Sequence, residues 1–328
     1  MKAIQFSEYG GYDKLEIVDR EMPILKEGQL LVKVTYAAVN PVDDTIRKGE
    51  IKLSTPKILG NEGAGTIIKG NDEFPAGTRV IISVIDSDGR IRGIASEGAW
   101  QEFLAVYPSE VVKTPDHVTD EQAASFSGGF LSAYVSLDKA EFIAGKSVLS
   151  LAVGGGVGNA GSQLAKALGA SLVITTAGST AKAEVAAKAG FENIIDLSKE
   201  SISDGVTRLT DGKGVDIVID MLGGNITGDA LSALAKFGIL VSLGYSAGME
   251  FKAKITDFVW KAIQMRGVSL SNWGTLQDYQ RALGVLLPLL EEGKIKPTVA
   301  KVFPFEQAGE ANRFLIEERP FGKVLLKF

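Results

Sequence analysis

The sequence predicts an α/β protein with two parts, a doubly wound parallel sheet and a second domain made mostly of β-strands. Short strand-like segments separated by turns fill the first ~120 residues. After them, continuous apolar runs of strand length alternate with helical segments, as in a parallel sheet covered on both faces. A glycine-rich turn joins the first of these apolar runs to the helix that follows it.

The first part of the chain has the composition of a small barrel or sandwich. Segments of strand composition alternate with turns rich in glycine, proline and aspartate, and they lie at 30–34, 66–69, 78–84 and 103–106. A final apolar strand is predicted at 322–328. We expect the end of the chain to return to this first domain.

Near residue 120 the pattern changes to helices and buried strands. A helix is predicted over 120–138 and a long one over 276–292. Between them, strands expected to be buried on both faces alternate with shorter helices, the strands at 147–153, 171–176, 215–220 and 238–243 and the helices at 158–169 and 179–190. We therefore expect one domain over 1–122 and 299–328, and the parallel-sheet domain over 123–298.

The composition excludes several kinds of site and partner. The 328 residues include no cysteine and a single histidine, so the chain has no disulfide and no Cys/His zinc site. One histidine also argues against a Ser-His-Asp or Cys-His hydrolase, because this single residue would have to be the general base. The formal net charge of -5 and the pI of about 5.2 argue against nucleic acid as a partner.

The hydropathy pattern predicts neither a membrane span nor a secretion signal. No apolar run approaches the ~18 residues that a membrane-spanning helix needs. The first six residues lack the apolar core of a signal peptide. We therefore expect a cytoplasmic protein with no membrane partner.

The strongest chemical signal is the glycine-rich turn after the strand predicted at 147–153. The backbone of Gly155, Gly156, Val157 and Gly158 is expected to approach a pyrophosphate, because glycines allow a tight turn and a helix N-terminus offers unpaired N–H groups. The alternative is a tight turn without a ligand. Its position inside a strand–turn–helix unit favours a dinucleotide site.

The segment after the next strand indicates which dinucleotide is bound. An NAD site places a carboxylate about 20 residues past the glycine turn, and here none appears before Glu184. Hydroxyl residues followed by a lysine suit a 2′-phosphate, so we expect NADPH, with Thr176, Ser179 and Lys182 among its contacts. In this interpretation Ser179 donates to the phosphate and Lys182 supplies the charge. The alternative is a helix cap at Ser179 and a solvated Lys182.

Motifs spread over essentially the whole chain resemble those of a known superfamily. They are Asn40-Pro41-Val42-Asp43 with Arg47 and Gly49, Gly60-Asn61-Glu62-Gly63, Gly77-Thr78-Arg79-Val80, the glycine turn with Gln163 and Lys166, Gly214-Val215-Asp216 with Asp220 and Gly223-Gly224, and Arg319-Pro320-Phe321-Gly322-Lys323-Val324. Together they resemble the medium-chain dehydrogenase/reductase superfamily, and within it the zinc-free quinone oxidoreductases related to zeta-crystallin.

The resemblance implies a fold and an activity. It implies a GroES-like catalytic domain, a Rossmann-type NADPH domain and an active site in the cleft between them. The implied reaction is hydride transfer from NADPH to a quinone or to the C=C bond of an α,β-unsaturated carbonyl compound. Zinc-dependent relatives place a cysteine near the Asn40 position and a histidine at the Asn61 position, so the resemblance implies no metal here. It also implies a homodimer formed at the edge of the Rossmann sheet, where 268–271 could pair.

Three polar residues after the strand predicted at 30–34 are candidates for catalysis. Hydride addition builds negative charge on a carbonyl oxygen, and the Asn40 amide is the first candidate to donate to it, with a turn-forming Asn-Pro as the alternative. Asp43 could orient a water or polarise the site, or cap a helix. Arg47 could hold an acidic group of the substrate, or form a salt bridge within its domain.

Further cofactor contacts are expected in the second domain. Ser132 aligns with a family threonine near the nicotinamide or its ribose, and the alternative is a hydroxyl bonded to its own helix. Gly244 and Tyr245 follow a buried strand at the carboxyl edge of the sheet, where open α/β sheets bind ligands. Leu222, just after the strand predicted at 215–220, is the last expected contact.

The chain also departs from the family it resembles. Many members carry a tyrosine shortly after the position of Gly49, and here it is absent, so the sequence assigns no proton donor. A second family tyrosine aligns with Leu197, and Val153 stands where the family has a small residue. Two alternative functions stay open, an enoyl-thioester reductase and a non-catalytic NADPH-binding protein.

Overall fold

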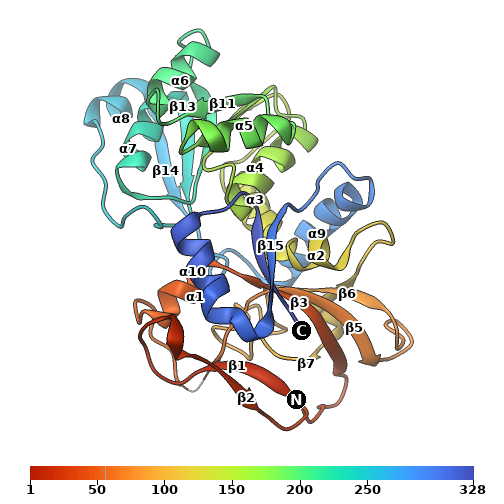
Figure 1. The fold of residues 1–328 in the computed structure, drawn as a ribbon. Coiled ribbons are helices and arrows are strands. Elements are labelled where there is room, and N and C mark those ends of the chain that lie inside the picture. The colour runs from red at the N-terminus through yellow and green to blue at the C-terminus, as the bar shows by residue number, and fades with distance from the viewer. Residues whose placement is uncertain (56) are drawn as a thin grey trace. The chain divides into compact units, whose positions relative to one another are not determined.

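The computed structural model describes residues 1–55 and 57–328, and in it the chain divides into two compact units. Unit 1 comprises Met1–Gly128, Gly274–Gln280 and Pro297–Phe328, and unit 2 comprises Gly129–Trp273 and Arg281–Lys296 (Figure 1). These bounds lie a few residues from the expected ones, and Gly274–Gln280 groups with unit 1. No helix in the described part of the chain is both long and apolar enough to cross a membrane.

Unit 1 is built from two sheets. The larger has the order β15 (Val299–Pro304), β16 (Lys323–Lys327), β3 (Leu30–Val39), β5 (Gly63–Lys69), β6 (Arg79–Ile82) and β8 (Val111–Lys113), with β7 (Phe103–Val106) also paired to β3. The smaller has the order β2 (Leu15–Asp19), β1 (Lys2–Phe6) and β4 (Lys57–Ile58). The unit's α-helices are α1 (Pro41–Arg47), α2 (Asp120–Ala124) and α10 (Ala308–Glu318). Short 3-10 turns lie at Tyr12–Lys14, Pro108–Glu110 and Phe305–Gln307.

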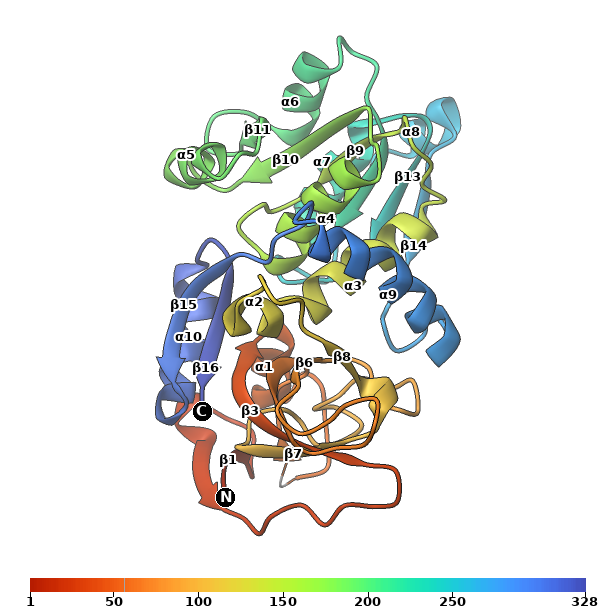
Figure 2. The same ribbon diagram turned by 90° about the vertical axis from the view of Figure 1, so that its right-hand side faces the viewer.

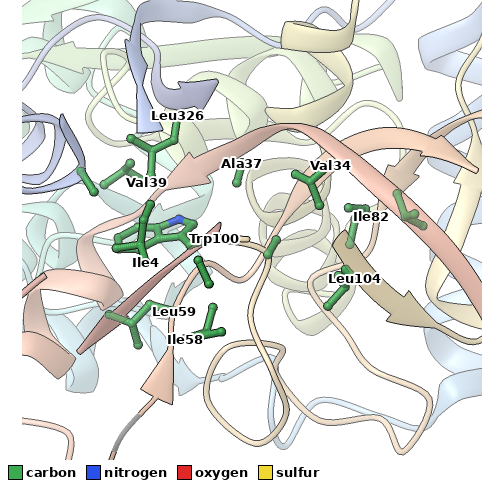
Figure 3. Close-up of a cluster of buried hydrophobic side chains, with 14 of the residues drawn as sticks. Ile4, Val34, Ala37, Val39, Ile58, Leu59, Ile82, Trp100, Leu104 and Leu326 are labelled. Atoms are coloured by element: carbon green, nitrogen blue, oxygen red, sulfur yellow. The ribbon is translucent and has the colours of Figure 1, made fainter. Parts of the chain in front are cut away.

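Trp100 is fully buried in the apolar core of unit 1. Side chains from both sheets surround it, including Ile4 and Val39 (Figure 3). Its indole N–H donates to the Ala38 carbonyl at 3.0 Å, which satisfies the buried donor. This contact ties the core to the end of β3, where the candidate catalytic residues begin.

Unit 2 contains a parallel sheet of six strands in the order β11 (Asn193–Asp196), β10 (Leu172–Ala177), β9 (Ser147–Ser150), β12 (Val215–Asp220), β13 (Leu234–Ser242) and β14 (Gln264–Gly267). The helices between these strands are α4 (Gly156–Ala167), α5 (Thr180–Lys188), α6 (Ile202–Leu209), α7 (Gly224–Ser232) and α8 (Ile255–Lys261), and they pack around the sheet (Figure 2). Numbered along the chain, the strands lie in the order third, second, first, fourth, fifth and sixth, which is the dinucleotide-binding order. The prediction of a doubly wound parallel sheet with a mostly β second domain is confirmed.

The helix predicted over 120–138 is two helices, α2 and α3 (Ser127–Lys139). Thr119 caps α2 by accepting the N–H of Gln122, and α2 ends when the Ser125 hydroxyl donates to the Glu121 carbonyl at 2.8 Å. A new helix start therefore falls near Gly128, whose N–H is left free to bond elsewhere. The long helix α9 (Leu276–Glu291) contributes residues to both units.

Candidate functional site

The glycine turn of unit 2 lies between β9 and α4, and Thr176 on β10 holds it in place. The Thr176 hydroxyl accepts the N–H of Ala152 at 2.9 Å, and the Thr176 carbonyl accepts the N–H of Val153 at 3.0 Å. Ala152 has a positive φ of 57°, so β9 ends before the turn rather than at residue 153 as expected. Thr176 is buried, and its two hydrogen bonds fix the backbone at the start of the turn.

The turn presents unpaired N–H groups where a pyrophosphate would lie. Gly155 is the N-cap of α4, and the N–H groups of Gly156, Val157 and Gly158 have no partner among residues 1–55 and 57–328. A Cβ added at the exposed Gly155 would meet only the Ala152 carbonyl oxygen, at 3.4 Å, whereas one at Gly158 would lie 2.0 Å from the Leu151 carbonyl oxygen. Unpaired N–H groups beside the accessible Gly155, with Gly158 packed closely behind them, fit the pyrophosphate of a bound dinucleotide.

Ser179 is the N-cap of α5, and its hydroxyl oxygen accepts the N–H of Lys182 at 3.4 Å. The expected alternative of a helix cap is therefore present, and it still leaves the Ser179 O–H able to donate. Lys182 is half-buried in the first turn of the same helix. The pair stands together at the carboxyl end of β10, as a phosphate contact requires.

Asp196 is a carboxylate at this end of the sheet that the sequence analysis did not single out. It ends β11, the neighbour of β10, and it accepts hydrogen bonds from the hydroxyls of Ser198 and Thr180, both at 2.6 Å. Those bonds hold its pKa below its ordinary value, and Lys199 pairs with it at 3.2 Å. Its position at a strand end next to β10 is the signal that could have identified it.

The loops after β12 and β13 carry the remaining expected contacts. Asp220 is fully buried and accepts the N–H of Leu222 at 2.8 Å, while the carbonyl of Leu222 accepts the N–H of Ala247 at 2.6 Å. Gly244 is half-buried and Tyr245 is exposed. Because β9, β10, β12 and β13 are parallel neighbours, their carboxyl ends share one edge of the sheet. The structure thus brings most of the predicted cofactor residues to a single edge.

Ser132 lies on α3, close to the start of α4. A Cβ added at Gly129 of α3 would be 2.9 Å from the Gly156 carbonyl oxygen, so the two helices approach closely there. Ser132 follows one turn later, nearly buried, and its carbonyl accepts the hydroxyl of Ser136 at 2.8 Å. The Ser132 hydroxyl itself has no partner within the part of the chain that the structure describes.

In unit 1, three neighbouring strands bring four polar residues to one edge of the larger sheet. Asn40 follows the last residue of β3, Asn61 and Glu62 precede β5, and Lys323 begins β16. Both β5 and β16 pair antiparallel with β3, in the registers Ala37↔Gly63 and Val39↔Val324. The end of one strand and the starts of two others therefore meet at this edge.

These four residues form one hydrogen-bonded network, which we call the Lys323 network. The Lys323 ammonium donates to Glu62 Oε1 and to Asn40 Oδ1. Asn40 Nδ2 donates to Asn61 Oδ1 at 2.7 Å and to Glu62 Oε1 at 3.1 Å. Glu62 is fully buried, and its Oε2 accepts the N–H of Gly128 at 2.6 Å, the donor freed by the break before α3.

Neither Glu62 nor Lys323 was singled out as a site residue from the sequence. The two are 261 residues apart in the chain, although each lies in a motif that carries the family resemblance. Asn40, the expected carbonyl donor, already uses both of its amide hydrogens inside the network.

Asp43 lies beneath the Lys323 network and is buried, with an exposed fraction of 2%. Its carboxylate accepts the N–H of Asn40 at 2.7 Å and the N–H of Gly60 at 3.4 Å. Burial raises the pKa of Asp43 to about 7, although these N–H groups and the nearby Lys323 oppose the shift. Its contacts match the expected alternative of a helix-capping residue, since it is the third residue of α1.

Arg47 is buried inside unit 1 by local partners. Its guanidinium pairs with Asp44, donates to the Gly10 carbonyl and lies 4.1 Å from the centre of the Tyr12 ring. This is the salt bridge within the domain that the sequence analysis left as the alternative. The geometry gives no support to a contact between Arg47 and a substrate.

Comparisons with known proteins find relatives along the whole chain. Family models described as "Zinc-binding dehydrogenase" and "Alcohol dehydrogenase GroES-like domain" match residues 156–287 and 26–116. The chain is 33% identical to the NADPH-dependent alkenal/one oxidoreductase, chloroplastic, of Arabidopsis thaliana, over 99% of this chain and 79% of that protein. It is 29% identical to an NAD-dependent alcohol dehydrogenase of Sulfolobus acidocaldarius, over 100% and 99%. The crystal structure of a Pseudomonas syringae quinone oxidoreductase matches with a TM-score of 0.85 at 30% identity, covering 100% and 99%.

Proposed function

The chain belongs to the medium-chain dehydrogenase/reductase superfamily, in its quinone oxidoreductase family related to zeta-crystallin, and on that premise we propose its activity. We propose a zinc-independent reductase that uses NADPH to transfer hydride to a quinone or to the C=C bond of an α,β-unsaturated carbonyl compound. The observation that carries the proposal is the cradle of unpaired N–H groups at Gly156, Val157 and Gly158, at the carboxyl edge of the parallel sheet.

The choice of NADPH rests on the carboxyl end of β10. The segment from 173 to 182 contains no carboxylate, and it ends in Ser179 with a free O–H and in Lys182. The Arabidopsis relative is named as NADPH-dependent, whereas the Sulfolobus relative is named as NAD-dependent. The neighbouring strand β11 ends in a carboxylate, Asp196. Its two oxygens, which would have to accept the ribose hydroxyls of NAD, already accept the hydroxyls of Thr180 and Ser198. When bound, the cofactor supplies the hydride.

Zinc independence rests on the donor set in unit 1. One matching family model is named for zinc, but this chain has no cysteine and a single histidine. Asn40 and Asn61 stand at the edge of the sheet with the Lys323 ammonium between Asn40 and Glu62. Amides and an ammonium ion do not supply the anionic sulfur or imidazole ligands that zinc prefers, and the ammonium charge repels the metal. The one carboxylate of the network, Glu62, is already paired with Lys323 and bonded to Asn40 and Gly128. These side chains do not fit a zinc ion.

The residues of unit 1 are proposed to bind and orient the carbonyl group of the substrate. Hydride addition builds charge on that oxygen, and preorganised amide donors stabilise it. Asn40 and Asp43 position such a donor. Asn40 does so through its bond to Asn61, and Asp43 does so by accepting the N–H groups of Asn40 and Gly60. We assign Arg47 to the stability of α1 and its neighbours instead.

We also propose that two copies of the chain associate through unit 2. β14 lies at the end of the sheet order, and α8 before it exposes Ile255, Val259 and Trp260. The expected pairing segment 268–271 is a turn rather than a strand, because the N–H of Asn272 donates to the Ser269 carbonyl and the N–H of Ser269 donates to the Asn272 side chain. β14, which lies at one edge of the sheet and follows α8 in the chain, is the strand that we propose for pairing.

The proposed activity is tested with purified protein, NADPH and three acceptors: a 1,4-quinone, a short enone and an enoyl thioester. We expect loss of the reduced-nicotinamide absorbance with the quinone or the enone. Turnover of the enoyl thioester alone would favour the thioester reductase. Tight NADPH binding without turnover of any acceptor would favour the non-catalytic protein. The same panel after dialysis against a chelator should give unchanged rates.

A further inference from the structure

We propose that the side-chain amide of Asn61 donates the hydrogen bond that stabilises the carbonyl oxygen of the substrate, and that Lys323 fixes the orientation of this amide through Asn40. The inference deepens the proposed function and rests on it. It assigns the donor role to a residue that the sequence analysis considered only as a position without a zinc ligand.

The direction of every hydrogen bond in the Lys323 network follows from one group. An ammonium can only donate, so the Asn40 atom that faces Lys323 must be Oδ1. Asn40 Nδ2 then lies on the other side of the amide, where it donates at 2.7 Å. The Asn61 atom that receives this bond must be Oδ1, which leaves Asn61 Nδ2 at the far end of the chain of bonds. Lys323 therefore determines that the end of the network is a donor.

Among the described residues, Asn61 carries a whole donor group without a partner, whereas the buried Lys323 ammonium uses two of its three hydrogens on Glu62 and Asn40. The two hydrogens of Asn40 Nδ2 are used by Asn61 and Glu62, and both oxygens of Glu62 accept bonds. Asn61 Nδ2 has no partner among the residues that the structure describes. The side chain of Asn61 is half-buried, whereas Lys323 and Glu62 are buried. The charged groups of the network are therefore buried, and the unpartnered amide of Asn61 lies at its accessible end.

The backbone on both sides of Asn61 is closely packed. Gly60 has a φ of +88°, and a Cβ there would lie 2.2 Å from the Trp100 ring. The N–H of Gly60 donates to Asp43, and a Cβ at Gly63 would lie 2.7 Å from the Tyr36 carbonyl oxygen. A fixed backbone and a fixed amide give the preorganisation that makes an oxyanion donor effective.

The chemistry of the reduction requires such a donor. Addition of hydride to the β-carbon of an enone forms a C–H bond, and the π electron pair moves through the conjugated system onto the carbonyl oxygen. Asn61 Nδ2 donates to that oxygen while its charge develops, and the bonds from Lys323 through Asn40 polarise the amide further. A proton from water at the α-carbon then completes the reduction, so that two electrons and two hydrogens are added in total.

The first test replaces Asn61 and reads out the bound carbonyl group. Asn61→Asp keeps the size and the acceptor but removes the donor, and Asn61→Ala removes both without adding charge. A 13C=O-labelled enone is bound to full-length protein loaded with oxidised cofactor, which cannot reduce it. We expect the carbonyl stretch to be lowered in the wild type and to return toward its free value in both variants. With NADPH, kcat should fall by about 10²-fold, with the Kd for NADPH unchanged.

Asn71→Asp is the matched control. Asn71 lies in the turn after the opposite end of β5, where its Oδ1 accepts the N–H of Phe74 at 2.8 Å. The substitution makes the same chemical change in the same unit, and we expect no change in the carbonyl stretch or in kcat. If Asn61→Asp and Asn61→Ala keep the wild-type stretch and rate while the wild type reduces enones, the inference is wrong and the proposed function stands.

The second test removes the polarising charge. Lys323→Met alone would leave Glu62 buried without its partner, so it is combined with Glu62→Gln. We expect the doubly substituted protein to fold, and to show a carbonyl stretch between those of the wild type and Asn61→Ala. Its side-chain 15N–1H resonances for Asn61, measured without substrate, should also move. Unchanged Asn61 resonances would show that Lys323 does not orient the amide, whatever the activity of the protein.

Discussion

At the scale of single residues, Asp43 shows what burial does to a carboxyl group. It has no cationic partner as close as the one that Glu62 has in Lys323, and it is held by two N–H groups instead. Since its pKa is raised from 3.8 to about 7, the folded state binds a proton that the unfolded state releases between these values. The contribution of Asp43 to stability is therefore largest at low pH, and it is lost as the pH rises toward 7.

The stability of the folded chain should therefore depend on pH through Asp43. Between pH 4 and pH 7 the free energy of unfolding of the wild type should fall relative to that of Asp43→Asn, by up to about 4 kcal/mol. The amide introduced by this substitution keeps an acceptor for one N–H and does not titrate. Urea unfolding at a series of pH values measures the difference. A constant difference across this range would show that Asp43 is ionised throughout.

Lys182 is the residue proposed to make the protein prefer NADPH over NADH. Lys182→Ala should raise the Kd for NADPH about tenfold, because it removes the charge proposed to meet the 2′-phosphate, and it should leave the Kd for NADH unchanged. Lys188→Ala is the control, since Lys188 is an exposed lysine in the last turn of the same helix. Titration calorimetry with both cofactors gives the four constants. A wild-type preference for NADH would contradict the interpretation of this segment.

Single residues also show where sequence analysis reached its limit. The type and position of Asn40 indicated a polar role, but its amide is engaged by Lys323, which is 283 residues away. No local pattern contains that contact, because the pairing of β16 with β3 creates it. Likewise Thr176 was expected at the cofactor, and no local pattern indicates that its hydroxyl also accepts the N–H of Ala152 in the glycine turn.

At the scale of elements, the turn between β9 and α4 contains one glycine needed for packing and another proposed to contact the dinucleotide. A Cβ at Gly158 would clash with the backbone just after β9, whereas a Cβ at Gly155 would make one ordinary contact at 3.4 Å, at an ordinary φ of -84°. Gly158→Ala should therefore lower the free energy of unfolding by about 2 kcal/mol, through overpacking against carbonyl oxygens. Gly155→Ala should leave stability within about 0.5 kcal/mol of the wild type and weaken dinucleotide binding.

Thermal unfolding and a cofactor titration on the two glycine variants measure this difference. The two variants control for each other, since each adds a single methyl group to the same turn. If Gly155→Ala bound NADPH as tightly as the wild type, the open side of the turn would not be the pyrophosphate site.

Elements were predicted best where the signal is local. Apolar runs and the glycine turn indicated β9, β10, β12 and β13, because buried parallel strands have continuous apolar sequences. The break between α2 and α3 was missed, since the Ser125 side-chain bond that ends α2 and the Glu62 contact that holds the start of α3 depend on tertiary structure. The edge strand β14 was missed as well, because Gln264–Gly267 is short and mostly polar.

At the scale of the whole molecule, the exposed apolar face of α8 predicts self-association. Trp260 is 76% exposed, and Ile255 and Val259 lie four residues apart on the same helix. Trp260→Glu should shift the sedimenting species from a dimer toward the monomer of 34.8 kDa. Ile24→Glu is the control, because Ile24 is 91% exposed in unit 1 and should not affect assembly. A wild type that sediments as a monomer at micromolar concentration would contradict the proposed dimer.

The whole-chain architecture followed from the sequence because independent patterns agreed. The alternation of helices and buried strands predicted the parallel sheet, the glycine turn predicted a dinucleotide site, and the absence of cysteine excluded a Cys/His zinc site. The Lys323 network could not be derived in the same way, because its members come from β3, β5 and β16 and meet only in the folded sheet. Of the proposed site, the cofactor half was therefore accessible to sequence analysis, and the hydrogen-bond network in unit 1 was not.

The proposed reaction is direct hydride transfer from NADPH to a conjugated carbonyl compound without zinc. The most direct test supplies chelator-treated protein with NADPH deuterated at the transferring position and with a short enone, and analyses the product by mass spectrometry and NMR. We expect a saturated ketone with deuterium at the β-carbon. A product without deuterium, an allylic alcohol, or loss of turnover that zinc restores would contradict it.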